Sequence, residues 1–120
     1  MEISKLPKLW LFDLDGTLVK HNGYLIDGKD TLLDGAKEFL DNISKEDKIF
    51  IITARKKKYA FKTKRFLKKY KIRFDKIFFD MPVGERILIN DKKPKGLLTS
   101  VAINTVRDQF MNEKFEVSDI

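Results

Sequence analysis

The chain has 120 residues, with 25 Lys or Arg, 18 Asp or Glu and no Cys. This length fits one domain, 1–120. The lack of cysteine excludes disulfides, thiolate nucleophiles and cysteine-ligated zinc, and it is consistent with a cytoplasmic location. No apolar run approaches the roughly 18 residues that cross a bilayer, and residues 1–8 lack the apolar region of a signal peptide, so we expect no membrane partner. The net charge of +7 favours anionic partners.

Strand-like and helix-like segments alternate along the chain. Leu9–Phe12 is a short apolar run, typical of a buried strand. Apolar residues between Leu32 and Ile43 recur at helical spacing, with Asp30 as the expected N-cap. The remaining expected elements are a strand at Ile49–Ile52, a helix on the basic segment that follows, strands at Ile77–Phe79, Ile87–Ile89 and Val101–Ile103, and a short frayed helix after Arg107. This order predicts an α/β domain with a parallel sheet of about five strands flanked by helices.

The segment from Lys56 to Arg73 contains ten basic side chains and no acid. It is either a solvated helix face or a surface that grips a polyanion. Tyr59, Phe66 and Tyr70 fall on the stripe expected to face the core, so the helix should lack the exposed aromatics that stack on bases. We therefore do not expect a nucleic-acid partner.

Polar side chains follow three of the expected strands. Asp13 and Asp15 come after the first, Thr53 to Arg55 after the second, and Asn90 and Asp91 after the fourth. Ligands bind outside the carboxyl ends of parallel strands, so these groups should converge. Asp13 and Asp15 are two residues apart and project to the same side of an extended segment, and one or two carboxylates with a substrate phosphate suit magnesium. A calcium loop would need further oxygen ligands where Thr17-Leu18-Val19 stand.

Trp10–Leu18 resembles the first motif of the haloacid dehalogenase superfamily, an apolar strand followed by Asp-x-Asp-Gly-Thr. Ile51–Arg55 is similar to the second motif of that superfamily, and Ile87–Asp91 to the fourth. The resemblance covers about 9–106 and implies a single Rossmann-like domain of this type. Only 37 residues separate Asp15 from Thr53, and 37 separate Thr53 from Asp91, which leaves no room for a cap domain over the site.

The resemblance also implies a magnesium-dependent phosphatase. Asp13 would be the nucleophile that forms an aspartyl-phosphate, and Asp15 the general acid and base. Thr53 would bond the transferring phosphoryl group, and Asp91 would hold Mg²⁺ together with Asp13 and Asp15. An aspartate two residues after the nucleophile favours a phosphatase over a phosphotransferase or dehalogenase. The residues expected to contact the substrate phosphate are Gly16, Thr17, Ala54 and Arg55.

Two features depart from the superfamily pattern. Asn90-Asp91 offers one acid where two are usual, so metal affinity should be modest. No lysine or arginine stands at Asp80-Met81-Pro82, where the third motif often supplies a cation. We expect Lys93 to take this role because it follows the fourth strand closely. The alternatives are Lys92, Lys76 and Arg55.

The stretch from Met81 to Pro94 is similar to capless phosphatase-like proteins associated with sugar-nucleotide and surface-polysaccharide biosynthesis. This similarity implies a small phosphorylated sugar or polyol as substrate. One alternative is a phosphatase acting on nucleic-acid ends, since the first motif also resembles polynucleotide phosphatase domains. Another is a catalytically weak relative that binds a phosphorylated ligand or a partner protein. The open site would also allow a homo-oligomer in which a second copy covers it.

Overall fold

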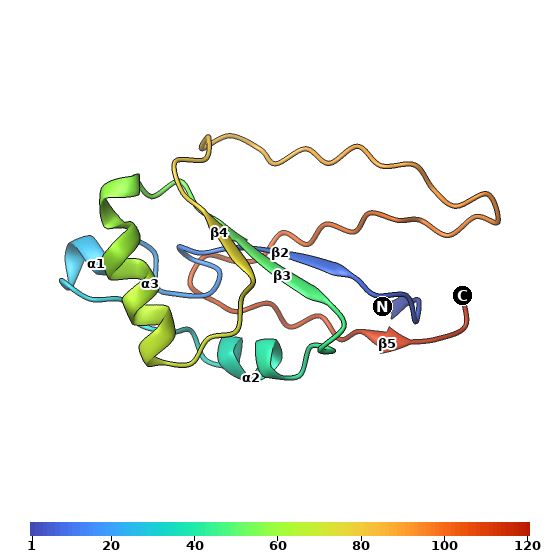
Figure 1. Cartoon of the computed structure of the whole chain (residues 1–120), viewed down its shortest axis with the longest axis horizontal. Helices are drawn as coiled ribbons and strands as arrows, with labels where there is room; N and C mark the ends of the chain where they lie inside the picture. Colours follow the sequence, from blue (N-terminus) through green and yellow to red (C-terminus); the bar gives the residue numbers. More distant parts are fainter.

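The computed structural model describes the whole chain, Met1–Ile120, and is built around a parallel three-stranded sheet (Figure 1). The strands β2 (Leu9–Asp13), β3 (Lys48–Ile52) and β4 (Lys76–Phe78) lie in the order β2-β3-β4. Asp13 is opposite Ile52, and Ile52 is opposite Phe78. The carboxyl ends of the three strands are therefore level at one edge, as the sequence predicts.

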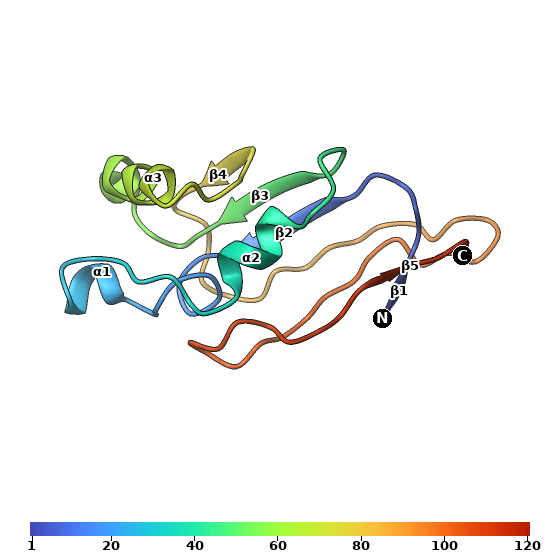
Figure 2. The same ribbon diagram turned by 90° about the horizontal axis from the view of Figure 1, so that it is seen from below.

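One face of this sheet carries the core. Ile49 and Ile51 on β3 are fully buried, and their register partners on β2 are Trp10 and Phe12. Two helices, α2 (Ala36–Asp41) and α3 (Ala60–Lys69), join the same hydrophobic cluster and can be seen beside the sheet in Figure 2. Leu11 belongs to the opposite face, where it is 48% exposed.

Short connections join the three strands. After β2 the chain turns at Gly16, whose φ of 81° favours glycine, and continues through α1 (Gly23–Ile26) and α2 to β3. The 3-10 helix η1 (Lys57–Tyr59) and α3 connect β3 to β4. No second domain is inserted in either connection.

The first expected helix is shorter than its apolar stripe. Gly35, with φ of 87°, is the N-cap of α2, so the helix begins at Ala36 rather than after Asp30. Asp30 instead forms an ion pair with Arg55. Leu32 lies in an extended segment that bridges to Val19, which explains its apolar character without a helix.

The strands expected at Ile87–Ile89 and Val101–Ile103 are absent, which corrects the sequence prediction. The chain leaves the sheet near Asp80, where φ is 58°, and runs outward as a long excursion, residues 83–106, which we call the arm (Figure 1, orange). The side chains of Ile87 and Ile89 are 82% and 91% exposed. Apolar content alone predicted strands here, but a strand also needs a ladder of backbone hydrogen bonds to a neighbour, and the backbone bonds within the arm are confined to its tip, between Lys93, Gly96 and Leu97.

The C-terminal segment ends in a strand rather than the expected frayed helix. β5 (Glu116–Val117) pairs in parallel with β1 (Glu2–Ile3), so the five strands form two separate parallel sheets. The ring of Phe115 lies 5.2 Å from that of Trp10, which anchors the segment to the core cluster. No helix has the length and apolar character needed to cross a membrane.

Candidate active site

A cleft of about 570 Å³ lies at the carboxyl ends of the sheet strands. The residues that line it come from the end of β2 and the loop after it, α1, the loop after β3, and η1. Others come from the start of the arm and from the residue that follows its end. Two Asp and five Lys or Arg are among them, so the cleft attracts anions. The lining residues are Asp13, Asp15, His21, Asn22, Tyr24, Leu25, Thr53, Ala54, Arg55, Lys56, Lys58, Tyr59, Val83, Arg86 and Arg107.

Asp13 is the last residue of β2, and its side chain is 36% exposed. The turn at Gly16 brings the Thr17 hydroxyl back to donate a hydrogen bond to Asp13 Oδ2 at 3.1 Å. Arg86 Nη1 donates to Asp13 Oδ1 at 3.2 Å. The carboxylate is therefore held in place by two donors, and it is still accessible from the cleft.

Asp15 is bound by a buried guanidinium. Arg55 donates from Nε and Nη2 to the two oxygens of Asp15, each at 2.9 Å. It also donates from Nη1 and Nη2 to Asp30, at 2.9 and 2.6 Å, and from Nη1 to the Thr63 hydroxyl at 3.0 Å. All the N–H groups of Arg55 are thus used.

Tyr24 completes this cluster, because the Arg55 guanidinium lies 3.9 Å from the centre of its ring. Burial alone would lower the pKa of Arg55, but hydrogen bonds and charge from Asp15 and Asp30 outweigh it and raise that pKa above its ordinary value. Burial, with a smaller contribution from Asp15, raises the pKa of Tyr24. The N–H groups that Arg55 was expected to offer a substrate phosphate are therefore all bonded to Asp15, Asp30 and Thr63 in this structure.

The other residues expected after β2 and β3 also meet at the cleft. Thr53 is 1% exposed, and its Oγ1 accepts a hydrogen bond from the Arg55 backbone N–H at 3.1 Å. Ala54 lines the cleft beside it. The Gly16 carbonyl accepts a hydrogen bond from the Asp108 N–H at 2.9 Å. This bond joins the segment that follows the arm to the loop after β2.

Asp91 and Lys93 are not brought to the cleft. Both lie near the tip of the arm, where the Lys93 N–H donates to Leu97 at 2.8 Å and the Asp91 carbonyl accepts a bond from the Thr99 hydroxyl. Lys92 lies between them. Lys76 begins β4, at the end of the strand remote from the cleft.

The cleft offers a reduced set of oxygen ligands for a metal ion. No group of three acidic or histidine side chains is clustered anywhere in the chain. Two hard oxygen donors nevertheless stand two residues apart in the sequence: the accessible carboxylate of Asp13 and the main-chain carbonyl of Asp15, which accepts no protein hydrogen bond. Magnesium is commonly held by one or two such groups together with substrate phosphate, so this pair fits it.

Two arginines at the cleft were not expected from the sequence, Arg86 and Arg107. Arg86 contacts the carboxylate directly, and Arg107 lies against the turn, with its Cγ 3.2 Å from where a Cβ on Gly16 would be. Arg86 stands between the expected third and fourth strands, where the third motif often supplies a cation, so its position in the sequence carried a signal for this role. Arg107 carried no signal, because only the return of the arm places it there.

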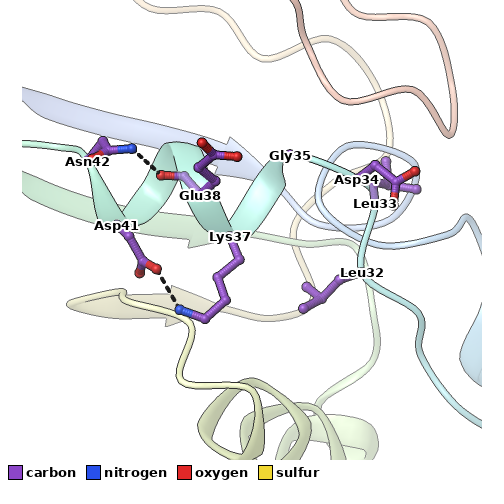
Figure 3. Close-up of a pocket in the computed structure, with 8 residues that line it drawn as sticks. All are labelled: Leu32, Leu33, Asp34, Gly35, Lys37, Glu38, Asp41 and Asn42. Carbon is purple, nitrogen blue, oxygen red and sulfur yellow. Dashed lines mark hydrogen bonds and ion pairs between the residues drawn. The ribbon is translucent and has the colours of Figure 1, made fainter.

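A second hollow, of about 600 Å³, lies along α2 (Figure 3). Its walls hold Asp34, Glu38 and Asp41 against the single cation Lys37, which pairs with Asp41 at 2.6 Å. A negative lining repels phosphate, so this hollow is not a second candidate for the same chemistry.

An apolar strand that ends in Asp-x-Asp-Gly-Thr at the carboxyl edge of a parallel sheet defines a domain of the haloacid dehalogenase type. Within that superfamily, the chain belongs to the NLI interacting factor-like phosphatase family, whose model matches residues 8–85. That range contains β2, β3 and β4 with their connections, and Arg86 lies just beyond it. A comparison with curated proteins finds no match.

Two solved structures are similar to this chain. One is described as "Structure of Pnkp1/Rnl/Hen1 complex", with 28% identity, a TM-score of 0.54, and coverage of 71% of this chain and 32% of that one. The other is described as "Structure of the Pnkp1/Rnl/Hen1 RNA repair complex", with the same identity and TM-score, and coverage of 72% and 30%. The chain therefore spans about a third of the length of the proteins it resembles.

Proposed function

We propose that the protein is a magnesium-dependent phosphatase in which Asp13 attacks phosphorus. The observation that carries this proposal is an accessible carboxylate at the end of a buried strand, held by Thr17 and Arg86 and flanked by Asp15. Membership of a phosphatase family supports the same reaction. A covalent intermediate divides the hydrolysis into two easier steps.

In the first step an oxygen of Asp13 bonds to phosphorus while the bond to the leaving oxygen breaks, and Asp15 protonates that oxygen. In the second, water attacks phosphorus, Asp15 takes its proton, and the bond to Asp13 breaks to release phosphate. Both oxygens of Asp15 accept bonds from Arg55, so Asp15 must turn one oxygen towards the cleft to act. The Thr53 hydroxyl, at the end of β3, would bond a phosphoryl oxygen.

Magnesium would be held by the Asp13 carboxylate and the Asp15 carbonyl, and when bound it supplies positive charge to the phosphoryl oxygens. Among the protein's own cations, Arg86 is placed to do the same from the other side of Asp13. Gly16 and Thr17 form the turn beneath this position.

The terminal phosphate of a nucleic-acid strand is the substrate class that the cleft supports best. Lys56, Lys58 and Arg107 line the cleft in addition to Arg86, and none of the four pairs with a carboxylate other than that of Asp13. Both similar solved structures belong to a complex, one of them described as an RNA repair complex. A small phosphorylated sugar or polyol is the second candidate, because a cleft of about 570 Å³ is large enough for it.

Release of phosphate from the two substrate classes tests the proposal. Oligonucleotides phosphorylated at the 3′ or 5′ end would be compared, at equal phosphate concentration and with Mg²⁺, with a panel of sugar and polyol phosphates. We expect the highest kcat/KM on one class of oligonucleotide end. A sugar phosphate turned over more efficiently would select the second candidate, and no hydrolysis of any ester would leave a phospho-ligand or partner-binding protein.

Replacing Arg86 by Ala should lower kcat/KM on a small phosphate ester by roughly 10²-fold, the scale of losing one electrostatic stabiliser. Arg86 contacts Asp13, whereas Lys93 is held at the tip of the arm. Lys93→Ala is therefore the matched control and should change kcat/KM little. A loss confined to Lys93→Ala would reverse the assignment and return the third-motif role to that lysine.

A third variant, Asp91→Ala, tests whether Asp91 holds the metal ion. The alternative to the assignment of Arg86 is that the first leg of the arm, 86–91, lies along the free edge of β2, which has no neighbour in the sheet. Asp91 would then reach the carboxyl end of β2 as a metal ligand and Lys93 would follow it to the cleft, whereas Arg86 would be carried away from Asp13 to the other end of the strand. This move would cover Ile87 and Ile89, which are exposed in the open arm. Asp91→Ala should then raise the Mg²⁺ concentration needed for half-maximal activity. An unchanged Mg²⁺ requirement would show that the arm does not deliver Asp91.

A further inference from the structure

The outer face of α3 combines exposed positive charge with one exposed aromatic ring. Phe61 is 77% exposed, whereas Thr63 and Leu67 of the same helix are buried. Arg65 is one helical turn from Phe61, and all the basic residues of the helix are exposed. They are Lys62, Lys64, Arg65, Lys68 and Lys69.

No carboxylate neutralises this face. Every ion pair in the chain involves other basic groups, and the ten basic residues of the segment 56–73 are not interrupted by an acid. A nucleic-acid partner was not expected from the sequence, because this helix was expected to lack exposed aromatics. That reason does not hold, because Phe61 is exposed and Tyr70, expected to face the core, is 44% exposed.

The face leads directly out of the cleft. Lys56, Lys58 and Tyr59 line the cleft, and α3 begins at the next residue, Ala60. A helix of ten residues spans roughly 15 Å, and stacked nucleotides are spaced at about 3.4 Å, so the face is long enough for about four nucleotides.

We propose that this face binds the single strand whose phosphorylated end enters the cleft, a proposal that rests on the phosphatase function above. Phe61 would stack on a base, while the lysines and Arg65 would contact the phosphates that follow. Stacking explains why an apolar ring stands amid cations, because every base presents an aromatic face to it. A duplex would keep its bases stacked on each other and would leave Phe61 without a partner, so the ligand is a single strand.

The test compares kcat and KM of full-length variants on a hexanucleotide with a terminal phosphate and on p-nitrophenyl phosphate. Phe61→Ala should raise KM for the hexanucleotide by roughly 10-fold, the typical effect of losing one stacked base, and leave the small ester unchanged. Phe61→Tyr, which keeps the ring, should behave as wild type. Lys68→Ala should lower the salt slope of binding by about 0.7, as expected for one lost phosphate contact.

Lys45→Ala is the matched control, because Lys45 is an exposed lysine that precedes β3, at the opposite end of the sheet from the cleft. It should alter neither substrate. If Phe61→Ala and Lys68→Ala left the hexanucleotide KM and binding unchanged while the ester was hydrolysed, the strand-binding face would be refuted and the phosphatase would stand.

If no ester were hydrolysed, the phosphatase proposal would fail, and fluorescence anisotropy with a labelled hexanucleotide would still test the face. Binding weakened by Phe61→Ala would support it, and binding independent of Phe61 would overturn it. An acidic phosphopeptide that bound more tightly than the hexanucleotide, again through Phe61, would overturn nucleic acid as the ligand.

Discussion

Asp13→Asn should lower kcat by roughly 10³-fold or more, because the amide is a poor nucleophile and loss of a nucleophile removes the covalent route altogether. The fold should survive. Asn keeps an oxygen for the Arg86 N–H, and its amide group can donate to the Thr17 hydroxyl, which accepts as well as donates. We expect the free energy of unfolding to change by no more than about 1 kcal/mol.

Steady-state hydrolysis of p-nitrophenyl phosphate and thermal unfolding of the same samples measure these two effects. Asp34→Asn is the control, since Asp34 is an exposed aspartate outside the cleft without an ion pair. If Asp13→Asn retained a tenth of wild-type activity, Asp13 would not be the nucleophile.

Asp15→Asn should lower kcat by about 10² to 10⁴-fold on an alkyl phosphate, the usual range for general acid–base catalysis. The loss should be smaller on p-nitrophenyl phosphate, because that leaving group needs little help from a proton. Asn cannot accept two bonds from Arg55 as a carboxylate does, so the variant should also lose stability, by about 1–3 kcal/mol.

Asp30→Asn separates the chemical from the structural effect. It also removes a carboxylate from Arg55 but leaves Asp15 in place, so it should reproduce the loss of stability with a much smaller loss of activity. Equal losses of activity in the two variants would mean that Asp15 only supports Arg55. Equal losses on the two substrates would argue against proton transfer by Asp15.

The sequence was sufficient to predict the sheet around the site but not the arm. Continuous apolar runs such as Ile49–Ile52 identify buried strands reliably when a partner strand is at hand, as β2 and β4 are for β3. Ile87–Ile89 has the same local character, yet it is exposed in the arm. Local composition does not determine which segment lies beside which, and that is where the prediction was wrong.

The site shows the same division. Asp13, Asp15 and Thr53 follow strands whose ends the parallel register levels, so their convergence could be predicted from the chain. The ion pairs of Arg55 with Asp15 and Asp30 could not be predicted, because the sequence pattern made Asp30 the expected N-cap of a helix. The helix begins later, at Ala36, and this leaves Asp30 free to pair with Arg55. The contact of Arg86 with Asp13 likewise depends on how the arm leaves the sheet.

A structure of the protein with Mg²⁺ and beryllium fluoride would test the central claim most directly. Beryllium fluoride mimics a phosphoryl group on a nucleophilic carboxylate. The account predicts the beryllium bonded to a carboxylate oxygen of Asp13, a fluorine within hydrogen-bond reach of Thr53 or Arg86, and Mg²⁺ on the Asp13 carboxylate and the Asp15 carbonyl. Beryllium bonded to another residue, or none bound at saturating concentration, would contradict the assignment of Asp13 as the nucleophile.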